Sequence, residues 1–185
     1  ESGASTFIAG PSFRSFTPSS ERLRVFPRID SLVKNITTYR GERLSAVARW
    51  LNFKVAARNI FNGYGSFDFS DDMVSLEVIN TGQPFTVTAP NTATDTAYRG
   101  QTEQITWNVS DTDLPPINTA NVDIFLSVDG GFTYPFILAT GVPNDGEETV
   151  VMPDTVSTKA RVKVKGAENV FFDISNADFK LVDSG

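Results

Sequence analysis

The chain has 185 residues, 40% of them hydrophobic, and a formal net charge of −6 at pH 7, with neither cysteine nor histidine. This composition excludes disulfides, thiolate nucleophiles, zinc-thiolate sites and imidazole acid–base catalysis. The acidic balance disfavours nucleic acid and anionic membranes as partners, and no apolar run approaches the ~20 residues that span a bilayer. The chemistry left to the chain is carboxylate-pair catalysis, metal binding by oxygen ligands, or binding without catalysis.

The first half of the chain predicts a small, irregular, β-rich module with one short helix. Phenylalanine and proline are interspersed through residues 1–28, a composition typical of extended segments rather than helices. Residues 29–37 place apolar side chains at helical spacing and predict one or two turns of amphipathic helix. Residues 49–58 and 73–80 alternate apolar and polar residues, and we expect them to form two strands that the loop at 63–65 joins into a long hairpin.

An acidic run before the second of these strands is the candidate metal site. Asp68, Asp71 and Asp72 lie close together in the sequence and offer the hard oxygen ligands that Ca²⁺ prefers. The alternative is that they are solvated turn residues, since aspartate forms local hydrogen bonds with turn backbone. The sequence therefore predicts either a structural calcium site or a polar turn at this position.

Aromatic residues around the hairpin loop form a candidate binding surface. Trp50, Tyr64 and Phe67 could present flat faces to a sugar ring or to a protein partner. The alternative is that Trp50 and Phe53 flank the core of the first module.

The second half predicts an immunoglobulin-like or fibronectin-type β-sandwich. Short alternating segments are separated by turn residues about every ten positions, and seven such strands in about 100 residues are typical of that fold. Trp107 is expected in its core. The chain is thus predicted to be all-β, with two tandem modules at residues 1–82 and 84–185 joined by a short linker. The predicted strands of the second module span residues 85–88, 103–109, 121–128, 133–139, 147–152, 159–165 and 170–182.

A hairpin motif inside this module has a structural interpretation. Ser127, Asp129, Gly131 and Thr133 fit the Asp-box pattern, in which an aspartate and hydroxyl groups hydrogen-bond the backbone of their own turn. Glycine supplies the positive φ angles of a tight hairpin turn. We expect this motif to hold the hairpin together without contributing chemistry.

Two other charged sets are interpreted as solvated surface. Asp111, Asp113 and Asp123 form a loose acidic set near Pro115 and Pro116, a stretch that predicts a loop. Lys159, Arg161, Lys163 and Lys165 alternate with apolar residues and are expected on the solvent-facing side of one strand.

Several motifs follow one another in an order that resembles a known protein family. They are Phe13-Arg14-Ser15-Phe16, Arg24-Val25-Phe26-Pro27-Arg28, Gly41-Glu42-Arg43-Leu44, Ala48-Arg49-Trp50-Leu51-Asn52-Phe53, Asp71-Asp72-Met73, the stretch 81–91, Gln104-Ile105-Thr106-Trp107-Asn108-Val109, Leu126-Ser127-Val128-Asp129-Gly130-Gly131, Pro143-Asn144-Asp145-Gly146 and Asn169-Val170-Phe171-Phe172-Asp173-Ile174-Ser175. In this order they resemble the non-catalytic region that follows the catalytic domain in secreted bacterial zinc metalloproteases of the reprolysin-like (metzincin) type.

The resemblance implies an extracellular accessory region that is not itself an enzyme. The family's zinc-binding signature, H-E-x-x-H-x-x-G-x-x-H, is absent, so zinc would belong only to a catalytic domain outside this sequence, and calcium is the sole cofactor considered for the chain itself. The implied partners are the parent catalytic domain and an extracellular protein or polysaccharide. The favoured role is targeting, binding or stabilising the parent enzyme. Two alternatives stay open: an independent carbohydrate-binding or adhesion module, and a structural spacer or folding aid.

Overall fold

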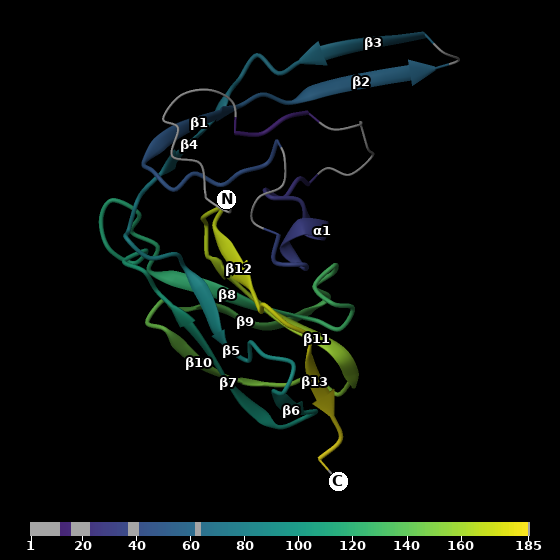
Figure 1. Cartoon of the computed structure of the whole chain (residues 1–185), viewed down its shortest axis with the longest axis vertical. Coiled ribbons are helices and arrows are strands. Elements are labelled where there is room, and N and C mark those ends of the chain that lie inside the picture. Colours follow the sequence, from purple (N-terminus) through teal and green to yellow (C-terminus); the bar gives the residue numbers. More distant parts are fainter. Residues whose placement is uncertain (1–11, 16–22, 37–40, 62–63, 185) are drawn as a thin grey trace. The chain divides into compact units, whose positions relative to one another are not determined.

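The structure is a computed structural model that describes residues 12–15, 23–36, 41–61 and 64–184. The described residues form thirteen strands and one short helix, which confirms the predicted all-β class (Figure 1). None of their helices is long and apolar enough to cross a membrane. By their contacts the residues divide into two compact units, one formed by residues 1–28 and 37–80, the other by residues 29–36 and 81–185.

The first unit contains two antiparallel ribbons. β1 (Arg49–Phe53) pairs with β4 (Val74–Val78), and β2 (Ala56–Phe61) pairs with β3 (Tyr64–Phe69). The two expected strands pair as β1 with β4, but the expected strand at 49–58 is interrupted at residues 54–55, and its second part pairs with β3, which was not predicted. The interruption has a local cause, because the N–H of Val55 donates to the Ser70 hydroxyl (3.2 Å) instead of to a backbone carbonyl. The expected loop is also shorter, since residues 64–65 already belong to β3.

Three phenylalanine rings form the apolar centre of this unit. Phe26 lies 4.7 Å from Phe13 and 5.1 Å from Phe53, measured between ring centroids. Beside them the carboxylate of Glu42, which is fully buried, accepts a hydrogen bond from the backbone N–H of Arg28 (2.9 Å). Segments distant in sequence thus meet at a small core, as the density of phenylalanine in the first half indicates.

The second unit is a two-layer β-sandwich with nine strands. One sheet has the order β10-β7-β5 and the other β6-β13-β11-β8-β9, with β12 pairing on β11. All these pairs are antiparallel except β6 with β13. The strands are β5 (Thr86–Ala89), β6 (Thr96–Tyr98), β7 (Thr102–Asn108), β8 (Asn121–Ser127), β9 (Phe136–Pro143), β10 (Glu147–Val151), β11 (Ser157–Gly166), β12 (Phe172–Ile174) and β13 (Phe179–Val182).

The core lies between these two sheets, where alternate residues of each strand point inward. Trp107 is 4% exposed, and its predicted core position is confirmed. Burial of each large apolar side chain contributes about 1.5–3 kcal/mol, so this core is the main source of the unit's stability. Its other large members are Val87, Ile105, Val122, Ile124, Leu126, Val150, Met152, Val162, Val164, Phe179 and Leu181.

The helix predicted within residues 29–37 is present as one turn, α1 (Ile29–Leu32). Asn35 has φ 54°, a left-handed conformation that ends helices. Although this segment was expected in the first module, its contacts are with the second unit. Val33 is 9% exposed, and the Asn35 amide donates to the carbonyl of Asn176 (2.7 Å). The chain therefore enters the second unit at residue 29, leaves it after residue 36 and returns at residue 81.

Candidate functional site

The predicted metal ligands lie on the first unit's hairpin. Asp68 is in β3, Asp71 and Asp72 are in the bend that follows, and all three are exposed. Asp68 accepts the neighbouring N–H of Phe69 (2.9 Å), and the Ser70 hydroxyl donates to the Asp72 carbonyl (2.7 Å). Among the described residues, no group of three His, Cys, Asp or Glu side chains is arranged to hold a metal ion. Calcium binding by these aspartates stays a prediction.

The predicted aromatic surface is described only in part. The side chains of Tyr64 and Phe67 lie outside the described residues, although their backbone belongs to β3. Trp50 is 59% exposed, whereas Phe53 packs in the ring cluster of the first unit. The expectation that Trp50 flanks this core is therefore wrong, because strand alternation places positions 50 and 53 on opposite faces. Of the three predicted surface aromatics, only Trp50 has a described side chain, and it is an exposed indole on β1.

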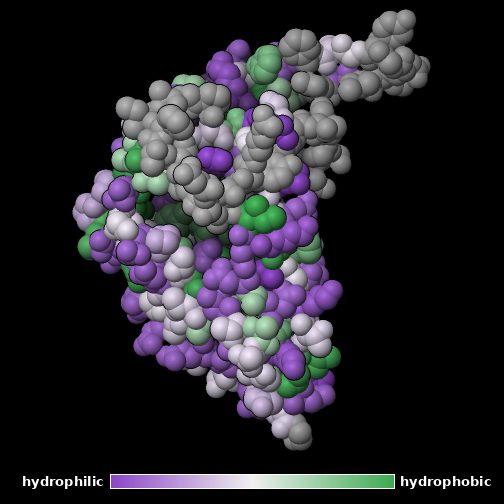
Figure 2. Space-filling model, in the orientation of Figure 1, coloured by the Kyte–Doolittle hydropathy of each residue, from purple (hydrophilic) through white to green (hydrophobic). Residues whose placement is uncertain are grey.

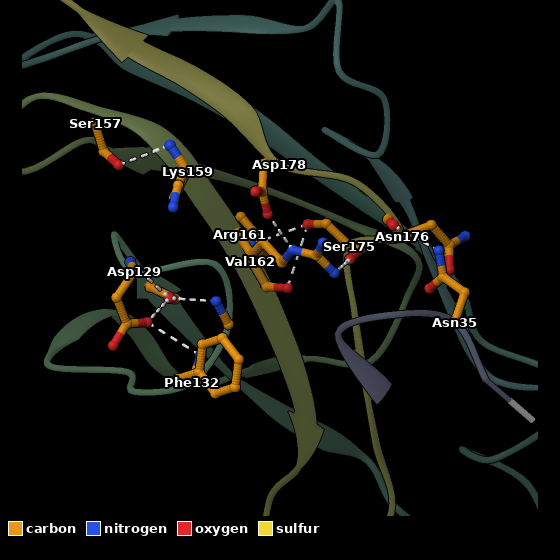
Figure 3. Close-up of polar contacts among 12 residues, drawn as sticks. Asn35, Asp129, Phe132, Ser157, Lys159, Arg161, Val162, Ser175, Asn176 and Asp178 are labelled. Atoms are coloured by element: carbon orange, nitrogen blue, oxygen red, sulfur yellow. Dashed lines mark hydrogen bonds and ion pairs between the residues drawn. The ribbon is translucent and has the colours of Figure 1, made fainter. Parts of the chain in front are cut away.

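The Asp-box residues form the hydrogen bonds that the pattern predicts (Figure 3). The Ser127 hydroxyl lies 2.7 Å from Oδ1 of Asp129 and accepts the N–H of Gly131 (2.8 Å). Asp129 accepts the N–H of Thr133 (3.0 Å) and, on its other oxygen, the Thr133 hydroxyl (2.6 Å). The turn is longer than expected, because these bonds hold residues 128–135 as a loop and the next strand begins at Phe136.

Hydrogen bonding also fixes the charge state of Asp129. Partial burial by itself raises the pKa of this carboxyl group, but hydrogen bonds from Thr133, Ser127 and the N–H of Phe132 outweigh it and lower the pKa to about 2. Because the ionised form is the one that accepts these bonds, Asp129 is a charged structural residue at neutral pH.

Arg161 departs from the interpretation of residues 159–165 as a solvated face. Its side chain is buried, and its Nε donates to Oδ1 of Asp178 (2.5 Å) while Nη1 donates to the carbonyl of Ser175 (3.1 Å), as Figure 3 shows. The Ser175 hydroxyl accepts the N–H of Val162 (2.9 Å). The connection between β12 and β13 thus covers Arg161. Alternation along β11 alone does not predict this burial.

An open cleft of about 590 Å³ lies in the second unit, beside the loops that follow β7 and β9. Three carboxylates, those of Asp111, Asp113 and Asp145, line it, and none of the lining residues is basic. Trp107 is among its lining residues although most of the indole is buried. The other lining residues are Thr81, Gln83, Asn108, Val109, Ser110, Leu114, Asn144 and Gly146.

Asn144 joins the segments around this cleft. Its Oδ1 accepts the indole N–H of Trp107 (2.9 Å), and its Nδ2 donates to the Thr112 hydroxyl (2.9 Å) and to the carbonyl of Thr119 (2.9 Å). The side chain is 4% exposed, so these bonds are shielded from water. One amide therefore ties the β9–β10 turn to β7 and to both ends of the β7–β8 loop. The sequence predicts a turn at 143–146 but gives no sign that Asn144 points inward.

The backbone at the start of the β7–β8 loop, which lines the cleft, is strained. Ser110 and Asp111 both have φ 56°, a left-handed conformation that costs a non-glycine residue about 1–2 kcal/mol. The Ser110 hydroxyl donates to the carbonyl of Gln83, which holds the loop against the segment that leads into β5. The start of the β7–β8 loop is thus hydrogen-bonded to the segment before β5 where both line the cleft.

No protein-family model matches the chain, and no curated protein matches it.

Proposed function

We propose that this chain is a non-catalytic accessory region of a secreted bacterial zinc metalloprotease, and that it engages a protein substrate through the acidic cleft of its sandwich. The main support for this proposal is the cleft, whose bordering loops are joined by hydrogen bonds. Asn144 holds those loops by three buried hydrogen bonds, while Asp111, Asp113 and Asp145 are exposed at the rim. A rigid sandwich that presents loops at one end is an architecture suited to binding.

The chemistry of the rim favours a basic partner group. Three exposed carboxylates with no basic neighbour in the lining attract lysine or arginine side chains. The motif order that resembles metalloprotease accessory regions supports the assignment to a parent enzyme. In that setting zinc chemistry belongs to the catalytic domain, and this region positions the substrate.

The test compares the parent enzyme with two variants, one lacking residues 1–185 and one carrying Asp111→Asn, Asp113→Asn and Asp145→Asn. Both variants should lower kcat/KM on a folded protein substrate and leave kcat/KM on a short peptide unchanged, because a short peptide does not reach the cleft. The triple substitution changes only exposed side chains, so folding is preserved.

Two outcomes separate this proposal from a spacer role. If the triple variant matches the wild type on protein substrates, the cleft is not the binding site. If the deletion shortens the half-life of the parent without changing either kcat/KM, the region is a spacer or folding aid.

A carbohydrate-binding role is the second candidate, and the exposed indole of Trp50 favours it. Sugar rings stack on such faces, and Trp50 lies opposite Glu77 in the β1–β4 pairing, next to a carboxylate that can accept hydroxyl groups. Retention of the chain on insoluble polysaccharide that is lost in Trp50→Ala would establish this role. Retention unaffected by that substitution, or none on a broad panel, would refute it.

A further inference from the structure

A second surface of the sandwich has the properties of an interaction site. It lies on the outer face of the larger sheet, away from the core, and we call it the lysine face. Its members come from β8, β9, β11, β12 and the loop between β8 and β9. They are Phe125, Tyr134, Ile137, Lys163, Lys165 and Phe172.

The pairing register shows that these side chains share one face. Lys163 of β11 lies opposite Phe125 of β8, and Phe125 lies opposite Ile137 of β9. Lys165 lies opposite Phe172 of β12. Residues directly opposite in an antiparallel pair point to the same side of the sheet. The two lysines of β11 therefore share one face with apolar side chains of β8, β9 and β12.

Lys163 is surrounded by aromatic rings. Its ammonium lies 4.2 Å from the ring centroid of Tyr134, 4.6 Å from that of Phe125 and 6.0 Å from that of Phe172. Such contacts attract a cation electrostatically, but a ring accepts the N–H groups of an ammonium only weakly. The side chain forms no hydrogen bond or ion pair with any residue in the described ranges of the chain, and it is half-buried.

Within the part of the chain that the structure describes, no carboxylate forms an ion pair with Lys163. Burial, and to a lesser extent the charge of Lys165, lower the pKa of Lys163. Asp123, which lies opposite Lys165 on the same face, accepts the N–H of Gly141 with its Oδ1 (2.9 Å) and forms no ion pair with Lys163 or Lys165. Arg161, the neighbouring cation on β11, already has its partner in Asp178. Lys163 and Lys165 are therefore two cations on one face whose donors have no hydrogen-bond or ion-pair partner among the described residues, which leaves them for a ligand.

We propose that the lysine face binds an acidic, apolar segment of another protein, with a carboxylate of that segment on the ammonium groups of Lys163 and Lys165. The net negative charge of the sandwich does not oppose this, because charges more than about 8 Å away are screened at physiological ionic strength. A carboxylate supplies the acceptors that the rings do not.

The apolar part of the face selects a protein over a polysaccharide. Ile137 is 64% exposed and is an aliphatic side chain with no flat surface for a sugar ring. Such a side chain suits Val, Leu or Ile side chains of a partner, and aromatic residues such as Phe172 are enriched in protein interfaces. This site is separate from the acidic cleft, which attracts the opposite charge, and the proposal does not rest on the identity of the parent enzyme.

The experiment selects 12-residue peptides from a random displayed library on the immobilised full chain in physiological salt, with counter-selection on Lys163→Gln. The recovered peptides should combine Asp or Glu with Val, Leu or Ile. Lys163→Gln and Lys165→Gln should each weaken their binding about tenfold or more, since a hydrogen bond between charged groups contributes roughly that factor. Lys159→Gln is the matched control, because Lys159 is an exposed cation of the same strand, and it should leave binding unchanged.

Thermal melts of each variant show whether the fold is intact, and Lys165→Gln provides a second variant should Lys163→Gln fail to fold. The proposal is wrong if no peptide distinguishes wild type from both lysine variants, if the recovered peptides carry no carboxylate, or if Lys159→Gln weakens binding as much. Binding of polygalacturonate in place of any peptide, lost in Lys163→Gln, would assign the face to an acidic polysaccharide and overturn the protein partner.

Discussion

The indole N–H of Trp107 donates to Oδ1 of Asn144 across 2.9 Å, and both side chains are almost fully buried. This bond joins the centre of the sandwich core to the turn that borders the acidic cleft. The Nδ2 group of Asn144 also donates hydrogen bonds to Thr112 and Thr119 of the β7–β8 loop. Core packing and loop conformation are therefore coupled through one side chain.

Asn144→Leu should destabilise the second unit by about 3 kcal/mol, because it leaves the Trp107 N–H and the Thr119 carbonyl without a partner in a buried site. In a domain of about 100 residues this lowers Tm by more than ~10 °C. The unfolding transition can be followed by Trp107 fluorescence in a Trp50→Phe background, since the chain has only two tryptophans. Asp145→Asn, an exposed change in the same turn, should leave Tm unchanged. Equal Tm values for the two variants would mean that Asn144 does not hold the loops.

Asp129 should make the sandwich sensitive to acid. Its pKa is lowered in the folded state to about 2, from an unfolded value near 3.9. The stabilisation is therefore complete above about pH 4 and is lost as the pH falls toward 2, where the folded carboxylate is protonated. Urea unfolding of wild type and Asp129→Asn at pH 2, 3, 4 and 5 should show a stability difference that shrinks as the pH falls. A difference independent of pH would contradict the hydrogen-bonded carboxylate as its source, and Asp113→Asn serves as an exposed control.

Calcium binding in the first unit is testable by melting the chain in EDTA and in millimolar Ca²⁺. If Asp68, Asp71 and Asp72 hold the ion, calcium at ~100 times its Kd should stabilise the folded state by about 2.7 kcal/mol. Asp71→Ala with Asp72→Ala should abolish the shift. Identical melts with and without calcium would leave these residues as a polar turn.

The strands of the sandwich could largely be predicted because one face of each meets a core. Val122, Ile124 and Leu126 alternate with polar residues along β8, and the pattern marks both the strand and its buried side. β6 could not be predicted, since Thr96–Tyr98 is too short to show a period and is defined by its pairing with β13. The strand expected at 170–182 divides into β12 and β13 around Ser175, whose hydroxyl is used to bind β11.

The candidate sites depend on tertiary contacts and were therefore less accessible from the sequence. Periodicity placed Arg161 and Lys163 on the same side of β11 as two equivalent cations. In the structure one is buried by an ion pair with Asp178 and the other lies among aromatic rings. Asn144, in a turn-forming sequence, was indistinguishable from a solvated turn residue. Alternation predicts which side of a strand a residue faces. It does not predict which distant segments of the chain cover that side.

The packing of residues 29–36 on the sandwich can be tested at Gly131. This residue has φ +91°, and an added Cβ would lie 3.1 Å from Cγ1 of Val33 and 3.1 Å from Cδ of Arg161. Gly131→Ala should therefore cost about 2–3 kcal/mol, of which backbone strain accounts for about 1 kcal/mol. Gly141→Ala is the matched control, because Gly141 has φ +63° with no atom within 4 Å of its added Cβ, and it should show the strain alone.

A double-mutant cycle isolates the contact with Val33. Val33→Ala removes the nearest methyl groups, so Gly131→Ala should cost less in that background than in the wild type. Additive effects, with no coupling between positions 33 and 131, would show that residues 29–36 do not pack on this loop in solution.

Asp173 should give the sandwich a pH dependence opposite to that of Asp129. Its carboxylate is largely buried and accepts the N–H of Val87 (2.8 Å), which joins β12 to β5 of the other sheet. Burial raises its pKa to about 6, although the backbone hydrogen bonds of Val87 and Ile174 act in the other direction. Since the unfolded pKa is near 3.9, the folded state binds more protons than the unfolded state between about pH 4 and pH 6. Stability therefore falls as the pH rises through this window.

Asp173→Asn retains an acceptor for the N–H of Val87 and removes the buried charge. At pH 7 this variant should be more stable than the wild type by about 2 kcal/mol, and the advantage should disappear near pH 4, where the wild-type carboxyl group is protonated. Urea unfolding at pH 4, 5, 6 and 7 measures both effects, with Asp123→Asn as a control on the outer face of the same sheet. A variant that is less stable than the wild type at pH 7 would show that the ionised carboxylate stabilises the junction of β5 and β12, and the sign argued from burial would then be wrong.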